Sequence, residues 1–337
     1  MTAEPAATEA TIPSFLAESG WAQAQRLRLA GDASARRYER LRLAGQTAVL
    51  MIAPPDASFA RFQQIDAWLL ASGFSAPRIL ASRAESGLML LEDFGDALLA
   101  RLLAQDPVLE PQYYGAITDF LAALHRLPAP EFLAPLDGET LAGLLALTLD
   151  WYPKRSASAA AQLPERFIEA YGELEPLPPV LCLRDFHAEN VIWLPEREGP
   201  AQLGLLDFQD AVAAHPAYDL VSALQDARRD VSPQVEAVQL HRYCALRGLK
   251  EAPFSKAYAL LGAQRALRIL GVFARLAQAF GKPQYLPLMP RVWQNLQRNL
   301  SHPGLEAFAQ LVTEAFPPPD PPLLVQLSKP CPTPPQP

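Results

Sequence analysis

Apolar positions in the first hundred residues mostly follow the two-residue repeat of β-strands. In the segment RRYERLRL, residues 36–43, Leu41 and Leu43 fall on one face and Arg40 and Arg42 on the other, which predicts a strand with one buried side. After a short turn, the apolar run TAVLMI, residues 47–52, predicts a buried strand that ends before Pro54 and Pro55. Two further strands are predicted at residues 78–81 and 88–91.

A helical repeat of three and four residues interrupts these strands and then dominates the rest of the chain. Between Ser58 and Gly73 the apolar residues share one helical face, and a short leading helix is predicted over residues 11–24. Further helices are predicted at residues 114–124, 140–151, 164–171 and over most of 219–311, with two short strands at 180–183 and 203–206 between them. We therefore expect a small β-rich lobe followed by a larger helical lobe.

These patterns predict where the lobes begin and end. The N-terminal lobe is expected to span residues 1–95, with a hinge near Glu92–Asp96, and the helical C-terminal lobe residues 96–315. The remaining segment, 316–337, is rich in proline, a composition typical of flexible segments. We predict an α+β fold with a flexible tail.

Composition excludes several classes of function. The chain has 337 residues and a net charge of −7, which disfavours general binding to nucleic acid or to anionic membranes. No apolar run of about 18 residues is present, and the acidic N-terminus does not resemble a signal peptide. The three cysteines are far apart, which disfavours both a disulfide framework and a zinc site. We expect a cytoplasmic monomer.

Polar side chains follow two of the predicted short strands. The first strand leads into LRDFHAEN, which contains Asp185 and Asn190, and the second leads into LLDFQDA, which contains Asp207. A carboxylate and an amide oxygen together suit Mg²⁺, and the remaining carboxylate is able to accept a proton from a hydroxyl. Each residue alone is more often a strand-end cap. The two motifs in this order match the catalytic loop and metal-binding motif of protein-kinase-like folds, which transfer phosphoryl groups.

On these and further motifs the chain resembles the aminoglycoside-phosphotransferase-like kinases. Within them it is most similar to the anomeric sugar kinases that phosphorylate N-acetylmuramate and N-acetylglucosamine in cell-wall recycling. The resemblance extends over about 260 residues in family order, a span that we estimate from the motif positions alone. The matching stretches are GDASARRY (31–38), LRDFHAEN (183–190), LLDFQDAVAAHPAYDLVSAL (205–224), QRALRILGVFARL (264–276) and GKPQYLPLMPR (281–291).

The resemblance implies a protein-kinase-like bilobal fold and a role for each motif. Asp185 is implied as the catalytic base, with Asn190 and Asp207 as ligands of Mg²⁺. GDASARRY is implied as the loop over the phosphates of ATP, and LMLLEDFG as the hinge that meets adenine. The implied nucleotide-binding residues are Ser34, Arg36, Arg37, Glu92, Asp93 and Phe94.

Two departures from the family pattern concern charge and packing. Leu183 stands where related kinases usually have histidine, a largely architectural residue. Kinases of this fold also carry a lysine on the strand after the phosphate loop, yet the first lysine of this chain is Lys154. We expect Arg36 or Arg37 to supply the missing charge, because a guanidinium fork binds phosphate well. The alternatives are that backbone and Mg²⁺ manage alone and that both arginines lie on a solvated strand face.

The charge pattern of residues 252–303 bears on the acceptor. This segment contains Lys256, Arg265, Arg268, Arg275, Lys282, Arg291 and Arg298 but no Asp or Glu. Such a surface repels a polycationic aminoglycoside and accepts a neutral amino sugar or one with a lactyl carboxylate. We expect Arg265 and Arg275 to face inward and bind substrate, although most of these cations lie on solvated faces. Gln209 and Asp210 either bind the sugar or stabilise the loop.

The expected reaction is ATP-dependent phosphorylation of the anomeric C1 hydroxyl of N-acetylmuramate, N-acetylglucosamine or both. Asp219 is expected to brace the catalytic loop. Two alternatives stay open at this point. One is a kinase of the same fold that acts on an aminoglycoside or another small alcohol, such as choline, homoserine or a fructosamine. The other is a nucleotide-binding pseudokinase scaffold, which the missing lysine keeps open and the intact set of Asp185, Asn190 and Asp207 disfavours.

Overall fold

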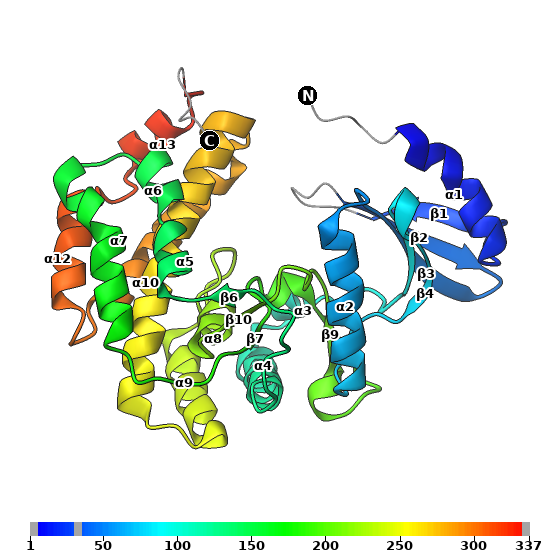
Figure 1. Cartoon of the computed structure of the whole chain (residues 1–337), viewed down its shortest axis with the longest axis horizontal. Coiled ribbons are helices and arrows are strands. Elements are labelled where there is room, and N and C mark those ends of the chain that lie inside the picture. Colours follow the sequence, from blue (N-terminus) through cyan, green and yellow to red (C-terminus); the bar gives the residue numbers. More distant parts are fainter. Residues whose placement is uncertain (1–5, 30–35, 332–337) are drawn as a thin grey trace. The chain divides into compact units, whose positions relative to one another are not determined.

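The computed structural model describes residues 6–29 and 36–331 of the chain (Figure 1). It divides into two compact units, each described by itself below. Unit 1 comprises Met1–Pro107 and Ala188–Ala211, and unit 2 comprises Val108–His187 and Val212–Pro337. The residues predicted as the N-terminal lobe all fall in unit 1, which also takes in a later segment of the chain. None of the described helices combines the length and hydropathy needed to cross a bilayer.

Unit 1 is built on an antiparallel sheet in which β2, β3, β4 and β5 match predicted strands and β1 was not predicted. Its 5-stranded order is β1-β2-β3-β5-β4, so β3 lies at the centre and pairs with β2 and β5. The turn between β2 and β3 has left-handed backbone at Ala44 and Gly45 (φ 48° and 81°), which glycine adopts without steric cost. The strands are β1 (Gln25–Arg28), β2 (Arg37–Leu43), β3 (Gln46–Ile52), β4 (Ile79–Arg83) and β5 (Leu88–Glu92).

Two helices complete the core of this sheet region. Helix α1 (Ala6–Glu18) ends earlier than predicted, and its Phe15 packs in one cluster with Leu41 and Leu50 of the sheet. Helix α2 (Ala57–Ala71) has the predicted apolar face and begins at Asp56, whose carboxylate accepts from the Ser58 amide. Sequence periodicity was sufficient for α2, because this helix buries only one face.

The second segment of unit 1 is a short hairpin that the sequence did not assign to this unit. Strands β8 (Val191–Trp193) and β9 (Leu203–Leu205) are antiparallel, and the 3₁₀ turns η3 (Ala188–Asn190) and η4 (Gly199–Gln202) precede them. The Phe208 ring, just past β9, stacks on Phe62 of α2 with ring centroids 4.7 Å apart. Helix α3 (Leu99–Gln105) contacts both β8 and η3. Tertiary packing, rather than chain order, places this hairpin in unit 1.

Unit 2 is helical apart from one small sheet. Its 3-stranded order is β6-β10-β7, with β7 antiparallel to β10 and β6 parallel to it. The strands are β6 (Pro135–Leu136), β7 (Val180–Cys182) and β10 (Val212–Ala214). The helices are α4 (Glu110–Leu124), α5 (Gly138–Gly143), α6 (Ala146–Trp151), α7 (Ala157–Gly172), α8 (Ala217–Leu224), α9 (Pro233–Arg247), α10 (Glu251–Phe280), α11 (Met289–Leu300), α12 (Glu306–Ala315) and α13 (Pro321–Leu327). The single helix predicted over residues 140–151 is therefore two helices.

Helix α10 is the central element of unit 2, with α6 beside it in Figure 1. It has 30 residues and contacts α6, α8 and α11. Small residues allow these close approaches. At Gly271 a Cβ atom would lie 2.4 Å from the Thr148 backbone nitrogen of α6, and the Thr148 hydroxyl donates to the Leu267 carbonyl at 2.6 Å. Contacts with α6 thus fix one side of helix α10, and its other face carries residues of the candidate active site described below.

The proline-rich tail differs from the flexible segment expected from its composition. Phe316 is buried and meets the Tyr152 ring edge-on at 5.9 Å, and the Tyr152 hydroxyl donates to the Pro317 carbonyl at 2.9 Å. Helix α13 begins at Asp320, whose carboxylate caps it, with prolines in its first turn where no amide donor is needed. Residues 332–337 lie outside the described residues.

The close contact at Gly271 makes a stability prediction. Gly271→Ala forces a methyl group against the α6 backbone and should lower the free energy of unfolding by about 1–3 kcal/mol. Gly143→Ala is the matched control, because a Cβ there meets nothing within 4 Å and should be neutral or stabilise by about 0.4–1 kcal/mol. Chemical denaturation of both variants measures the difference. Equal stabilities would contradict the tight α6–α10 contact.

Candidate active site

Hydrogen bonds from side chains of helix α8 hold the loop that carries Asp185. The Asp219 carboxylate accepts the amides of Leu183 and Arg184, at 2.5 and 2.9 Å. The Ser222 hydroxyl, one turn further along α8, donates to the Arg184 carbonyl at 3.0 Å. Arg184 has φ 69°, a left-handed conformation that non-glycine residues rarely adopt. These bonds hold the unusual turn, so that Asp219 braces the loop as predicted.

Asp219 is a fully buried acid, and its surroundings shift its pKa in opposite directions. Burial raises the pKa of this carboxyl to about 7, against the two amide hydrogen bonds and the charge of Arg265. Both carboxylate oxygens accept from amides, so the geometry is that of an ionised acceptor. Leu183, at the position where relatives carry histidine, is buried at 3% exposure. The turn at residues 183–185 therefore keeps its shape without a histidine there.

Asp185 projects beyond this braced turn. Its side chain is 49% exposed, and one of its oxygens lies 3.9 Å from Nη2 of Arg265, which is buried on α10. Arg265 is itself fixed by a 2.8 Å hydrogen bond to the Ser222 hydroxyl. Burial would raise the pKa of Asp185, but the positive charges of Arg265 and Arg268 outweigh it and lower the pKa below its usual value. Asp185 is thus an ionised acceptor at neutral pH.

Unit 1 brings the two predicted magnesium ligands to one end of a hairpin. Asn190 immediately precedes β8 and Asp207 follows β9, and the Leu206 amide donates to the Asn190 carbonyl at 2.9 Å. The Gln209 amide donates to an Asp207 oxygen at 2.9 Å and leaves the carboxylate 49% exposed. The Asp207 backbone is left-handed, with φ 56°, which aspartate tolerates better than most residues. Carboxylate and amide oxygens on rigid backbone fit a magnesium site.

The structure distinguishes the two arginines that were candidates for the missing lysine. The Arg36 side chain is 7% exposed, lies 3.7 Å from an Asp207 oxygen and donates to the Ser58 hydroxyl at 3.1 Å. Arg37 is more exposed and pairs with Glu39 at 3.3 Å. Arg36 therefore lies beside the candidate magnesium ligand, whereas Arg37 faces a neighbour on its own strand. Ser34 lies outside the described residues.

The predicted hinge residues are held by ionic contacts rather than left open. Glu92 accepts from Arg197 at 2.7 Å and from Arg78 at 3.2 Å. Asp93 pairs with Arg40 at 2.7 Å. The Phe94 ring contacts the Arg197 guanidinium, at 5.2 Å from the ring centroid, and its Cδ2 would lie 2.8 Å from a Cβ at Gly204. These contacts fix the hinge backbone, and its binding of adenine stays a prediction.

The four predicted substrate residues fall in different surroundings. Gln209 is buried and bonds to Asp207, and Asp210 pairs with Arg61 at 3.5 Å, both within unit 1. Arg265 faces inward as expected. Arg275 does not: its side chain is exposed and lies over the Phe280 ring at 5.4 Å. Arg275 follows Arg265 by ten residues on α10 and projects from a different face of the helix. The motif resemblance did not show which face each side chain occupies.

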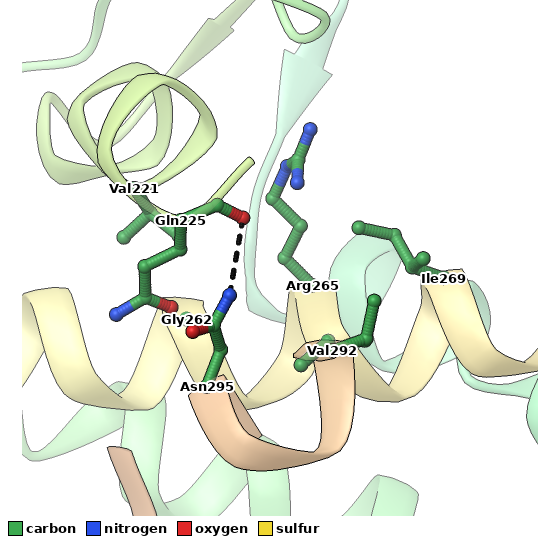
Figure 2. Close-up of a pocket in the computed structure, with 8 residues that line it drawn as sticks. Val221, Gln225, Gly262, Arg265, Ile269, Val292 and Asn295 are labelled. Carbon is green, nitrogen blue, oxygen red and sulfur yellow. Dashed lines mark hydrogen bonds between the residues drawn. The ribbon is translucent and has the colours of Figure 1, made fainter. Parts of the chain in front are cut away.

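A pocket in unit 2 lies beside Arg265 (Figure 2). Its walls come from the end of α8, from α10 and from α11, and Asn295 donates to the Gln225 carbonyl across it at 3.5 Å. The residues that line it are Val221, Gln225, Gly262, Arg265, Ala266, Ile269, Val292 and Asn295. Sequence reasoning missed Ser222, Gln225 and Asn295. The acid-free stretch of α10 and α11 was the available signal, but only the fold shows which faces meet.

Comparisons with known proteins agree with this geometry. The model of the phosphotransferase enzyme family matches residues 26–259. A choline/ethanolamine kinase family protein from Mesorhizobium loti has the same fold, with a TM-score of 0.62 at 14% identity over 90% of this chain and 99% of that one. The chain therefore belongs to the phosphotransferase enzyme family, and the predicted α+β protein-kinase-like fold is confirmed.

Curated relatives narrow the family further. The N-acetylmuramate/N-acetylglucosamine kinase of Caulobacter vibrioides is 42% identical in an alignment that covers 88% of this chain and 93% of the relative. The kinase of the same name from Pseudomonas aeruginosa is 29% identical, over 90% of this chain and 93% of the relative. Within the phosphotransferases, the chain belongs to the family of these kinases, and the predicted resemblance is confirmed.

The charge of Arg265 makes a prediction about pH. Arg265→Met removes the strongest opposing charge and leaves burial, so the pKa of Asp185 should rise. The acidic limb of kcat/KM should then move to higher pH, because the charges of the wild type hold the pKa of Asp185 below its usual value. A carboxyl-detected NMR titration reads the same pKa directly. Ser222→Ala is the control, since it removes the hydrogen bonds of Ser222 to Arg265 and to the Arg184 carbonyl but keeps the charge of Arg265. An unmoved pKa in Arg265→Met would contradict this assignment.

Proposed function

We propose that this chain is an ATP-dependent kinase that transfers the γ-phosphate to the anomeric C1 hydroxyl of N-acetylmuramate, N-acetylglucosamine or both. The observation that carries the proposal is the braced, ionised Asp185 beside Arg265 in a chain 42% identical to a kinase named for these two sugars. The aminoglycoside alternative is disfavoured, because the helices around the unit 2 pocket carry cations and no acids over residues 252–303.

Asp185 acts on the acceptor. Its carboxylate accepts a hydrogen bond from the C1 hydroxyl and takes the proton as the sugar oxygen bonds to the γ-phosphorus. The bond between that phosphorus and the β,γ-bridging oxygen breaks, and ADP leaves. A hemiacetal hydroxyl is more acidic than an ordinary alcohol, so a carboxylate with a low pKa suffices as base. Most of the rate enhancement comes from orientation and electrostatics, as in other phosphoryl transfers.

The residues of unit 1 act on the nucleotide. Asn190 and Asp207 are the side chains that would hold Mg²⁺, which neutralises charge on the phosphates when bound. Arg36 adds a fixed positive charge beside Asp207 and takes the part that a strand lysine plays in related kinases. Glu92–Phe94 offers hinge backbone to adenine. The product is a sugar 1-phosphate, a form suited to nucleotidyl transfer, and we place the reaction in the cytoplasm, in peptidoglycan recycling.

The proposal predicts the effect of removing the base. Asp185→Asn should lower kcat by about 10²–10⁴-fold with either sugar, because an amide cannot accept the proton, while nucleotide binding is retained. Phosphorus NMR should show a C1-linked phosphate for the wild type, together with ADP release. Wild-type turnover without an acceptor, or phosphate at another carbon, would overturn the proposal. Retained turnover in Asp185→Asn would remove Asp185 as the base.

The assignment of Arg36 predicts a contrast between neighbouring arginines. Arg36→Ala should raise KM for ATP and lower kcat, with a combined loss of about 10–100-fold in kcat/KM for a charged phosphate contact. Arg37→Ala should have a smaller effect, because its partner is Glu39. Steady-state kinetics at saturating sugar measures both variants. A larger loss for Arg37→Ala would transfer the phosphate-binding role from Arg36 to Arg37.

A further inference from the structure

Arg268 is a cation without a counter-charge contact. It lies on α10, is half-buried, and its Nε atom is shielded from solvent with no hydrogen-bond partner. Within residues 6–29 and 36–331, the guanidinium makes neither a hydrogen bond nor an ion pair. Three other arginines of α10 and α11 differ in this respect: Arg265 donates to Ser222, Arg291 pairs with Asp230, and Arg298 lies 2.9 Å from Glu236. Leaving a partly buried cation unpaired is costly.

The position of Arg268 places this cation at the acceptor side of the site. It follows Arg265 by three residues on α10, and side chains at that spacing are neighbours on a helix surface. Arg265 and Ile269, on either side of it in sequence, both line the unit 2 pocket, and Figure 2 shows their side chains reaching from α10 toward it. The charge of Arg268 also acts on Asp185. An anionic group on a ligand whose reacting hydroxyl meets Asp185 would pair with this guanidinium.

The chemistry of the two acceptor sugars supplies such an anion in one case only. N-acetylmuramate carries a lactyl ether with a carboxylate on O3, whereas N-acetylglucosamine has a hydroxyl there. A guanidinium binds a carboxylate through two parallel hydrogen bonds. The transferred phosphoryl group is the other possible anion, but the phosphate-side residues Arg36, Asn190 and Asp207 all belong to unit 1. Arg268 shares its unit and its helix with the pocket instead.

We propose that Arg268 binds the lactyl carboxylate of N-acetylmuramate and sets the preference of the enzyme between the two sugars. This inference rests on the proposed function. N-acetylglucosamine leaves the guanidinium unpaired, so that its binding lacks one charge-assisted contact. The residue is a specificity determinant, and Asp185 is the group that accepts the proton of the C1 hydroxyl.

The test compares acceptors within each variant. Arg268→Gln should lose about 10–100-fold in kcat/KM with N-acetylmuramate, the range for a charged hydrogen-bonded pair, and change less than about threefold with N-acetylglucosamine. The methyl ester of N-acetylmuramate should be as poor a substrate for wild type as for Arg268→Gln. Arg268→Lys should recover part of the loss. Lys256→Gln, which removes one positive charge from the same helix at an exposed pair with Glu173, should leave both sugars unchanged.

The outcomes distinguish a failure of the inference about Arg268 from a failure of the proposed function. Turnover of N-acetylglucosamine by Arg268→Gln shows that the variant is folded, and a selective loss with N-acetylmuramate supports the inference. An equal loss with both sugars assigns Arg268 to the phosphoryl group or to the fold and overturns it, as does no loss with either. If the wild type phosphorylates neither sugar, the proposed function fails and this inference with it. If the wild type phosphorylates both and only the selectivity is missing, the proposed function stands alone.

Discussion

The chemistry of this protein depends on one buried carboxylate. Asp219 accepts two backbone amides and thereby holds a left-handed turn at Arg184 that chain entropy and sterics oppose. Arg265 then bonds to Ser222 of the same helix and sets the charge state of Asp185. Because these contacts come from α8 and α10, the position of Asp185, the candidate base, follows from how those two helices pack.

Charge is distributed differently in the two units. Unit 1 pairs its cations with acids around the hinge and the candidate magnesium ligands, where Arg40 binds Asp93 and Arg36 lies near Asp207. Unit 2 gathers cations along α10 and α11 without acids on those helices after residue 251. Carboxylate oxygens are suited to a metal ion that binds the triphosphate, and guanidinium groups are suited to an anionic or neutral acceptor. The candidate metal ligands and the arginine that we propose for carboxylate binding thus belong to different units.

Sequence patterns predicted several elements of unit 1. Strands β2, β3 and β5 and helix α2 fall close to their predicted bounds, because the apolar repeats of β2 and α2 and the apolar runs of β3 and β5 mark them locally. Prediction failed where contacts with segments distant in the sequence determine the local structure. One expected helix is divided into α5 and α6, and the proline-rich tail forms α13 around the buried Leu323 and Leu327, whose burial depends on surfaces far away in sequence.

The sequence by itself determined the chemical groups: Asp185, Asn190 and Asp207 in their order, the absence of a strand lysine, and an acid-free stretch near the C-terminus. Motif spacing carries this information because each group acts from a fixed place on the chain. Only the tertiary structure decided that Arg36 rather than Arg37 lies beside Asp207, and that Arg265 is buried while Arg275 is exposed. Side-chain direction depends on which helices and strands pack together, and local sequence does not encode that contact.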